Sequence, residues 1–314
     1  MADTRFKKTP LHYLQYLALK FFCVILGILP YKIAVGISRW ATGISRYFLP
    51  KRFKLACTNI QKAFPDKSEK EVFAIALKSW KNMGGIMAET VQLTRMKKEE
   101  FLKHCRVIGI EKMYALKGKS GALIHIGHFT NWEAFGLAGS LLGVDKAVLA
   151  QRVDNPYIDE EINRLRNTFS GQVFYSNNEY KPFFACMRWL KKNKVLGILF
   201  DQNVVSGAIW LPFMNRICAW SPITALLSIK MQLPVYPVKV WREKDGTIVS
   251  EILDPVYPPS EYSMDNVRRF TKQLIGFYEQ WLKEDPASWL WAHNRWKREQ
   301  EGENYLKQHP EECL

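Results

Sequence analysis

The sequence predicts an α/β fold, in which a central mixed, mostly parallel sheet is flanked by helices and an N-terminal helix anchors the chain to a membrane. Three observations support this fold class. Short apolar runs, typical of buried strands, alternate with amphipathic stretches between residues 122 and 283. Polar residues follow several of these runs, as they do at the ligand-binding edge of an open sheet. The segment from Leu11 to Leu29 is mostly apolar.

The individual elements are expected in a regular order. Ser68 and Glu71 have the spacing of a capping box that opens a long amphipathic helix, and residues 110–118 are expected to be helical. Strands are expected at 122–126, 146–152, 172–175, 195–200, 235–241 and 248–253, and the last two form a hairpin turned by Asp245-Gly246. Helices are expected after Asn131 and at 157–169, 183–192, 222–231 and 264–283.

This pattern divides the chain into three parts. Residues 1–50 are expected to form a membrane anchor with amphipathic helices, residues 51–300 the α/β domain, and residues 301–314 a highly charged, frayed tail. A bilayer core needs about 20 apolar residues, and the run from Leu11 to Leu29 is interrupted by His12, Gln15 and Lys20. A spanning helix and a helix lying in the membrane surface therefore both remain open.

Charge and cysteine usage limit the function classes. The 314 residues carry a formal net charge of +15, which predicts an anionic partner such as nucleic acid, an anionic membrane or an acidic carrier protein. Nucleic acid is disfavoured, because the sequence has no zinc-finger spacing, basic-zipper heptads or RNA-recognition motif. The six cysteines are scattered without a C-x-x-C pair, which indicates free thiols in a reducing compartment.

The best candidate for chemistry is the turn that follows the apolar run 122–126. His128 lies at the end of the predicted strand, and Asn131 is suited to cap the next helix, whose first turn carries Glu133. A histidine can act as a general base near neutral pH, and a carboxylate can hold its other ring nitrogen. We therefore expect His128 and Glu133 to be catalytic. The competing interpretation is a polar turn residue beside a carboxylate that complements the helix dipole.

Other polar residues follow predicted strands and are expected at the same edge of the sheet. Arg152 could bind a phosphate or an oxyanion. Asp201 follows the most apolar strand, where a carboxylate needs a partner, and we expect it to pair with Arg152 or to cap a turn. A metal site is not expected, because the histidines are too dispersed, and a serine hydrolase is disfavoured by the absence of a Gly-x-Ser-x-Gly elbow.

The residues from His128 to Glu133, HFTNWE, match the H-x4-D/E motif of the glycerolipid acyltransferase superfamily. The chain resembles in particular the late acyltransferases of bacterial lipid A biosynthesis. This resemblance rests also on NIQKAFPD at 59–66, RVDNP at 152–156, Asp201-Gln202 with Pro212-Phe213, and WAHNRWK at 291–297. The last segment departs from the family pattern, which has a leucine and a second basic residue there.

The resemblance implies an enzyme that moves a fatty acyl chain from an acyl carrier protein thioester to a hydroxyl of a lipid A precursor. It implies an acidic acyl carrier protein and an anionic glycolipid as partners, no cofactor, and a place at the cytoplasmic face of the bacterial inner membrane. His128 would be the general base with Glu133. Substrate- or oxyanion-binding roles would fall to a further set of residues: Arg152, Asp201, Gln202, Asn131 and Arg295.

Three alternatives remain open. Related families acylate phosphatidylinositol mannosides or other glycolipids with similar motifs, so the acceptor could be another glycolipid. A non-catalytic membrane module that binds anionic glycolipid would need neither His128 nor Glu133. A lipid hydrolase would use the same pair of residues with water as the acceptor.

Overall fold

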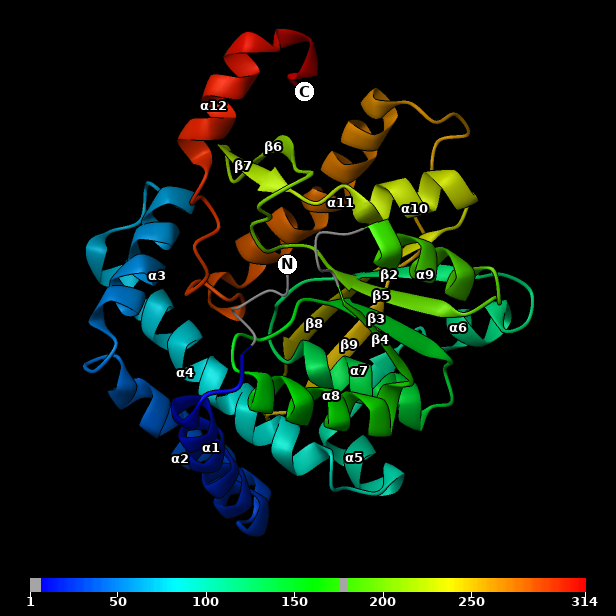
Figure 1. The fold of residues 1–314 in the computed structure, drawn as a ribbon. Helices are drawn as coiled ribbons and strands as arrows, with labels where there is room; N and C mark the ends of the chain where they lie inside the picture. Colours follow the sequence, from blue (N-terminus) through cyan, green and yellow to red (C-terminus); the bar gives the residue numbers. More distant parts are fainter. Residues whose placement is uncertain (1–6, 176–179) are drawn as a thin grey trace.

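The computed structural model describes residues 7–175 and 180–314. Within these residues a seven-stranded sheet has the order β1-β9-β8-β2-β5-β3-β4 (Figure 1). The pairs β2·β5, β2·β8, β3·β5, β3·β4 and β1·β9 are parallel and β8·β9 is antiparallel, so the prediction of a mixed, mostly parallel sheet is confirmed. The strands are β1 (Cys105–Ile108), β2 (Ala122–Ile126), β3 (Lys146–Ala150), β4 (Gln172–Tyr175), β5 (Val195–Leu199), β8 (Val235–Arg242) and β9 (Ile248–Ile252).

Helices cover both faces of this sheet. One face packs against α4 (Glu69–Leu93), α5 (Lys98–His104), α6 (Glu111–Leu116) and α7 (Trp132–Leu141), which bury Ile124 and Ile126 of β2. The other face packs against α9 (Tyr180–Leu190), α10 (Ile223–Met231) and α11 (Met264–Glu284). α8 (Pro156–Ser170) lies beside α7 and β4. All five residues of β2 are buried, as expected of a strand covered on both sides.

The predicted helix signals are found where they were expected. Ser68 and Glu71 form a reciprocal capping box at the start of α4, and Asn131 accepts a hydrogen bond from the Ala134 amide at the start of α7. Several elements were not expected: α3 (Pro50–Ala63), α5, β1 and a separate hairpin of β6 (Ile209–Phe213) and β7 (Arg216–Trp220). Both strands of that hairpin are largely buried, so they lack the alternation that indicates a strand.

The C-terminus differs from the expected frayed tail. Residues 299–308 form α12 (Glu299–Gln308), which packs on β7, and Gly302 lies against Trp210 and Ile217. A side chain at Gly302 would collide with the Trp210 ring, so glycine permits the close approach. The short 3-10 turns η2 (Pro286–Ser288) and η3 (Pro310–Glu312) flank this region.

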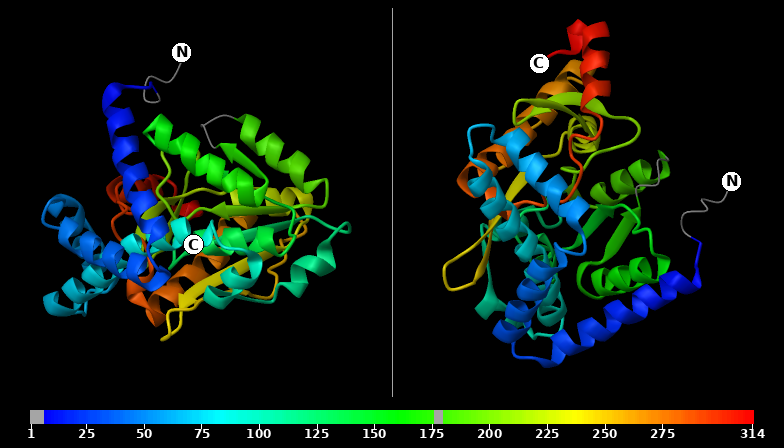
Figure 2. Two further views of the ribbon diagram at one scale, coloured as in Figure 1. Left: turned by 90° about the horizontal axis from the view of Figure 1, so that it is seen from below. Right: turned by 90° about the vertical axis from the view of Figure 1, so that its left-hand side faces the viewer.

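The N-terminal helices gather on one side of the molecule (Figures 1 and 2). α1 (Pro10–Ile28) runs along the body next to α8 and α4, while α2 (Tyr31–Ser45) packs on α4. Among the described residues, α1 is the helix that is long and apolar enough to cross a membrane. An apolar N-terminal helix that could anchor the chain is therefore part of the fold.

Candidate functional site

The turn between β2 and α7 has a well-defined geometry. Thr130 adopts a left-handed conformation with φ of 48°, and its amide donates to the Ser288 carbonyl at 2.7 Å. Phe129 forms an isolated antiparallel bridge with Trp289. Asn131 then caps α7 through its side-chain oxygen. These contacts hold His128 at the carboxyl end of β2, where ligands bind in open α/β sheets.

The ring of His128 is paired with Asp201. The Nδ1 atom of His128 lies 2.7 Å from Oδ1 of Asp201, and the His128 amide donates to Oδ2 at 2.8 Å. The two residues meet because β2 and β5 are parallel neighbours whose last residues, Ile126 and Leu199, are in register. An ionised carboxylate only accepts hydrogen bonds, so Nδ1 carries the proton and Nε2 has the free lone pair.

Asp201 is buried, and its carboxylate accepts hydrogen bonds from His128 and Trp289. Its side chain is 1% exposed, and Trp289 donates its indole N–H to Oδ2 at 2.7 Å. Burial acts to raise the pKa of this carboxyl group, but the His128 ring, the His128 amide and Trp289 outweigh it and hold the pKa well below its usual range. The carboxylate is therefore ionised and can stabilise an imidazolium.

The other side of the His128 ring is accessible. The side chain is 15% exposed, and the Gln202 amide nitrogen lies 3.3 Å from Nε2. Trp132 packs edge-on against the imidazole, with ring centroids 4.6 Å apart. Nε2 is thus the atom that a substrate hydroxyl can reach, with Gln202 beside it.

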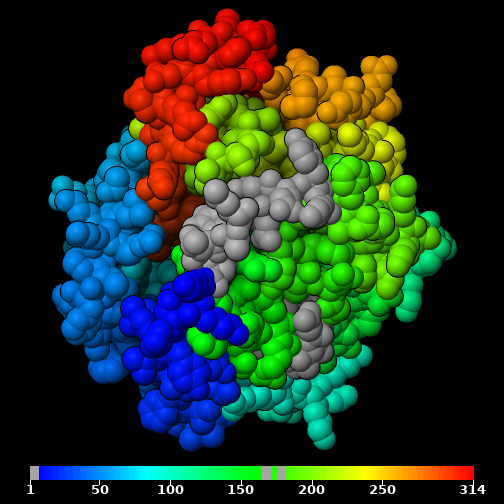
Figure 3. Space-filling view, in the orientation of Figure 1, coloured from blue at the N-terminus to red at the C-terminus, as the bar shows by residue number. Residues whose placement is uncertain are grey.

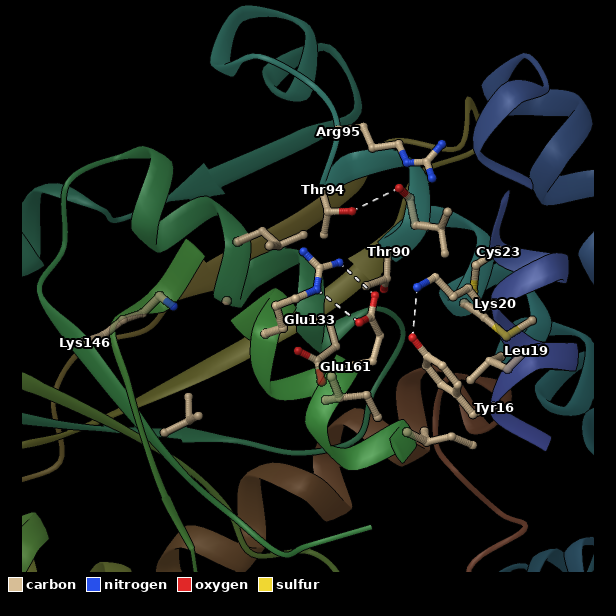
Figure 4. A pocket seen from close by; sticks show the side chains of 18 residues that line it. Tyr16, Leu19, Lys20, Cys23, Thr90, Thr94, Arg95, Glu133, Lys146 and Glu161 are labelled. Carbon is tan, nitrogen blue, oxygen red and sulfur yellow. Dashed lines mark hydrogen bonds and ion pairs between the residues drawn. The ribbon is translucent and has the colours of Figure 1, made fainter. Parts of the chain in front are cut away.

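The expected pairing of His128 with Glu133 is wrong. Among the described residues, the hydrogen-bond partners of the His128 ring are Asp201 and Gln202, and Glu133 is not one of them. Glu133 lies in the first turn of α7 and lines a cavity (Figure 4). The expected pairing of Asp201 with Arg152 is also wrong, because Asp201 is bound by His128 and Trp289.

The other predicted binding residues lie in different surroundings. Arg152 is exposed near the end of β3, with its guanidinium 4.9 Å from the centroid of the Tyr175 ring. Asn131 is fully buried and donates to Glu89 at 2.9 Å, so we interpret it as a helix cap in place of a substrate ligand.

Arg295 is also fully buried. Its guanidinium lies 3.9 Å from the centroid of the Trp220 ring and donates to the Ala219 carbonyl at 2.7 Å. This position is closed to a substrate, so the binding role expected for Arg295 is replaced by a packing role. Nearby, the Asn203 amide donates to His293 Nε2 at 2.8 Å, which ties the segment after Asp201 to the C-terminal segment.

A mostly apolar cavity of about 550 Å³ lies between α1, α4, α7, α8 and β3. Figure 4 shows Glu133, Lys146 and Glu161 with residues of α1 and α4 around it. A second cavity of about 70 Å³ borders the sheet and is lined by Trp132. The two cavities share four lining residues: Glu133, Gly136, Lys146 and Val148. Trp132 links the smaller cavity to the histidine, because it lines that cavity and packs against the His128 ring, whereas His128 itself lines neither of the two.

Sequence reasoning did not assign Trp289 to the site. Its role depends on the segment after α11 returning to the β2–α7 turn, where Ser79 donates to the Trp289 carbonyl at 2.6 Å. The signal available in the sequence was the cluster of tryptophans at 289, 291 and 296, which is unusual so close to a charged C-terminus.

Comparisons with known proteins identify the family of this chain. Residues 4–298 match the family model of bacterial lipid A biosynthesis acyltransferases. The chain is 22% identical over 302 residues to a lipid A biosynthesis lauroyltransferase of Escherichia coli K12, covering 93% of this chain and 94% of that protein. It is 20% identical to a palmitoleoyltransferase of the same organism, covering 88% and 89%. It is 21% identical over 192 residues to a phosphatidylinositol mannoside acyltransferase of Mycolicibacterium smegmatis, covering 60% and 62%. The chain belongs to the bacterial lipid A biosynthesis acyltransferase family.

Proposed function

We propose that this protein transfers a fatty acyl chain from the thioester of an acyl carrier protein to a hydroxyl group of a lipid A precursor at the cytoplasmic face of the inner membrane. The observation that carries the proposal is the His128–Asp201 pair, in which the His128 side chain stays 15% exposed and contacts Trp132, a residue that lines the smaller cavity. Family membership supports acyl transfer, and the net charge of +15 suits an acidic carrier protein and a phosphorylated acceptor.

In this mechanism His128 serves as base and then as acid. Nε2 takes the proton of the lipid hydroxyl as its oxygen attacks the thioester carbon, forming the C–O bond. The C–S bond then breaks, and the imidazolium returns the proton to the leaving thiolate. Asp201 accepts the Nδ1–H bond throughout and stabilises the imidazolium, as the carboxylate of a catalytic triad does. No protein nucleophile is required.

We assign the remaining candidate residues by their surroundings. The Gln202 amide adjoins Nε2 and is suited to hold the attacking hydroxyl or the developing oxyanion. Arg152, exposed at the same edge of the sheet, is suited to an anionic group of the acceptor or of the carrier protein. Glu133 borders both cavities and is suited to orient the substrate where the acyl chain enters.

The cavities suit an acyl chain because their lining is mostly apolar and because the smaller one is lined by Trp132, which contacts the His128 ring. A saturated chain attached to a thioester near His128 would extend past Gly136 toward α1. The polar residues Lys20, Arg95, Glu161 and Arg164 lie at the α1, α4 and α8 sides of the larger cavity.

The test is a transfer assay with purified protein in detergent. Acylated carrier protein is supplied with a lipid A precursor, with a phosphatidylinositol mannoside or with no acceptor, and the lipids are identified by mass spectrometry. Transfer to the lipid A precursor is expected. Transfer to the mannoside alone would favour the acceptor of the mycobacterial relative, and release of free fatty acid alone would favour a hydrolase. Binding of the glycolipid without turnover would contradict an enzymatic function.

A further inference from the structure

One face of α1 is an exposed apolar stripe. Its members recur at helical spacing and are between 41% and 75% exposed: Leu11, Leu14, Leu17, Phe21, Val24 and Ile28. The opposite face is turned toward the body, where Tyr16, Leu19 and Cys23 line the large cavity and Leu26 is fully buried. A soluble protein rarely leaves a continuous apolar stripe of this length in water.

Contacts hold both ends of α1 against the body. Near its start, the side-chain amide of Asn155 donates to the His12 carbonyl at 2.8 Å. The Tyr157 ring packs against the rings of Tyr13 and Tyr16. Near its end, Gln92 of α4 donates to the carbonyls of Leu26 and Leu29. The helix is therefore part of the folded body along its whole length.

This attachment argues against α1 crossing a bilayer. The 19 residues of α1 are about 28 Å long, close to the thickness of a hydrocarbon core, so length alone permits a span. A spanning α1 would carry α8 into the hydrocarbon beside it, including Glu160, Glu161 and Arg164. Charged side chains in that position are strongly disfavoured. A helix lying in the plane of the surface avoids this penalty and still buries the stripe.

Exposed apolar residues continue beyond α1. Ile33, Ile37 and Trp40 lie on one face of α2 and are 50%, 42% and 67% exposed. The turn that follows presents Phe48, which is 80% exposed, between two further exposed apolar side chains, Tyr47 and Leu49. α1 and α2 lie on the same side of the body (Figures 1 and 2), and α1 with its neighbours forms the lower left of the surface in Figure 3.

The positive charge of this region favours binding to an anionic membrane surface. From Thr4 to Pro65 the sequence contains lysines and arginines but no aspartate or glutamate. Lys7 and Lys8 precede the stripe, and Lys51, Arg52 and Lys54 follow the apolar turn, all of them exposed. Basic side chains at the edges of an apolar surface are the features that hold a protein on anionic phospholipids.

We infer that the α1 stripe, the exposed face of α2 and the turn at 47–49 form one surface that docks on an anionic phospholipid bilayer, with α1 lying in the plane of the membrane. Both ends of α1 are then on the same side of the bilayer. The large cavity lies one helix away from the lipid, because α1 forms its wall.

Two measurements test this inference without reference to catalysis. The first is flotation of the full chain with vesicles of phosphatidylcholine alone or with added phosphatidylglycerol. Phe21→Glu and Phe48→Glu are expected to weaken binding at least tenfold, and salt is expected to weaken binding of the wild type. The control is Tyr257→Glu, because Tyr257 is 70% exposed outside this surface. Retention of binding by both test variants, with wild-type thermal stability, would overturn the inference.

The second measurement determines the sidedness of α1. Lys7→Cys is introduced with Cys23 and Cys57 replaced by serine, and the exposed Cys313 serves as the reference on the body. A membrane-impermeant thiol reagent is applied to spheroplasts and to inverted membrane vesicles. Position 7 and Cys313 are expected to react in the inverted vesicles alone. Reaction of position 7 in spheroplasts with Cys313 protected would show that α1 spans the membrane.

Discussion

Asp201 binds the His128 ring at 2.7 Å, although 73 residues separate the two in the sequence. Replacing Asp201 with asparagine removes the charge that stabilises the imidazolium and allows the wrong ring tautomer. We expect Asp201→Asn to lower kcat on the order of 1,000-fold or more, with little change in KM. Glu133→Gln is the matched carboxylate control and is expected to lower kcat less and to raise KM. A larger kcat loss in Glu133→Gln would mean that Glu133 is the partner of the histidine in turnover.

Trp289 is predicted to position Asp201. Trp289→Phe removes a hydrogen bond to an ionised group, an interaction worth about 1.5–3 kcal/mol, so kcat should fall about 10- to 100-fold. Without that donor the pKa of Asp201 should rise. The control is Trp291→Phe, since the Trp291 indole donates to the Pro286 carbonyl and not to Asp201. Equal losses of kcat in both variants would assign Trp289 a packing role alone.

Gly136 borders both cavities, and a side chain added there would meet open space. Gly136→Met should therefore fold and should occupy volume that the acyl chain needs. We expect its preferred donor chain to become shorter, measured by competition between carrier proteins loaded with chains of different length. Gly276→Met, at an exposed helical glycine that also has open space around it, is the control and should retain the wild-type preference. An unchanged preference in Gly136→Met would show that the acyl chain does not occupy this cavity.

His125 is predicted to make the fold sensitive to acid. It is fully buried against Tyr278, its Nε2 lies 2.9 Å from the Leu274 carbonyl, and burial lowers its pKa to about 3. The unfolded chain has a histidine pKa of about 6.5. The contribution of neutral His125 is therefore complete above about pH 6.5 and is lost progressively as the pH falls toward 3, by a few kcal/mol in total.

The measurement is the free energy of unfolding by denaturant in detergent between about pH 7.5 and pH 4.5, across the unfolded-state histidine pKa. His125→Gln keeps a donor for the Leu274 carbonyl but does not titrate, so its stability should fall less steeply over this interval than that of the wild type. Identical slopes for the two proteins would show that His125 does not govern acid sensitivity.

Local patterns predicted the framework of the site. The apolar run at 122–126 and the cap at Asn131 are encoded within a dozen residues, so the position of His128 between strand and helix follows from the sequence. The partner of His128 does not follow from the sequence, because it depends on the pairing of β2 with β5, a long-range contact that local sequence patterns do not predict. Asp201 was recognised as a polar residue at a strand end, but its partner depends on strand order.

The missed elements have related causes. The strands of the β6–β7 hairpin are buried on both faces, so they lack a two-residue period. The charged residues after 298 suggested fraying, yet a single small residue, Gly302, lets α12 pack against Trp210. Trp289 reaches Asp201 only because the segment after α11 folds back on the β2–α7 turn.

The central claim is that Nε2 of His128 removes the hydroxyl proton during acyl transfer. The direct measurement is the single-turnover rate of transfer from acylated carrier protein to the lipid A precursor by His128→Ala, compared with His309→Ala, whose side chain is 43% exposed beyond α12. His128→Ala should be slower by about 100- to 10,000-fold at unchanged thermal stability, while His309→Ala should match the wild type. A wild-type rate in His128→Ala would contradict the account.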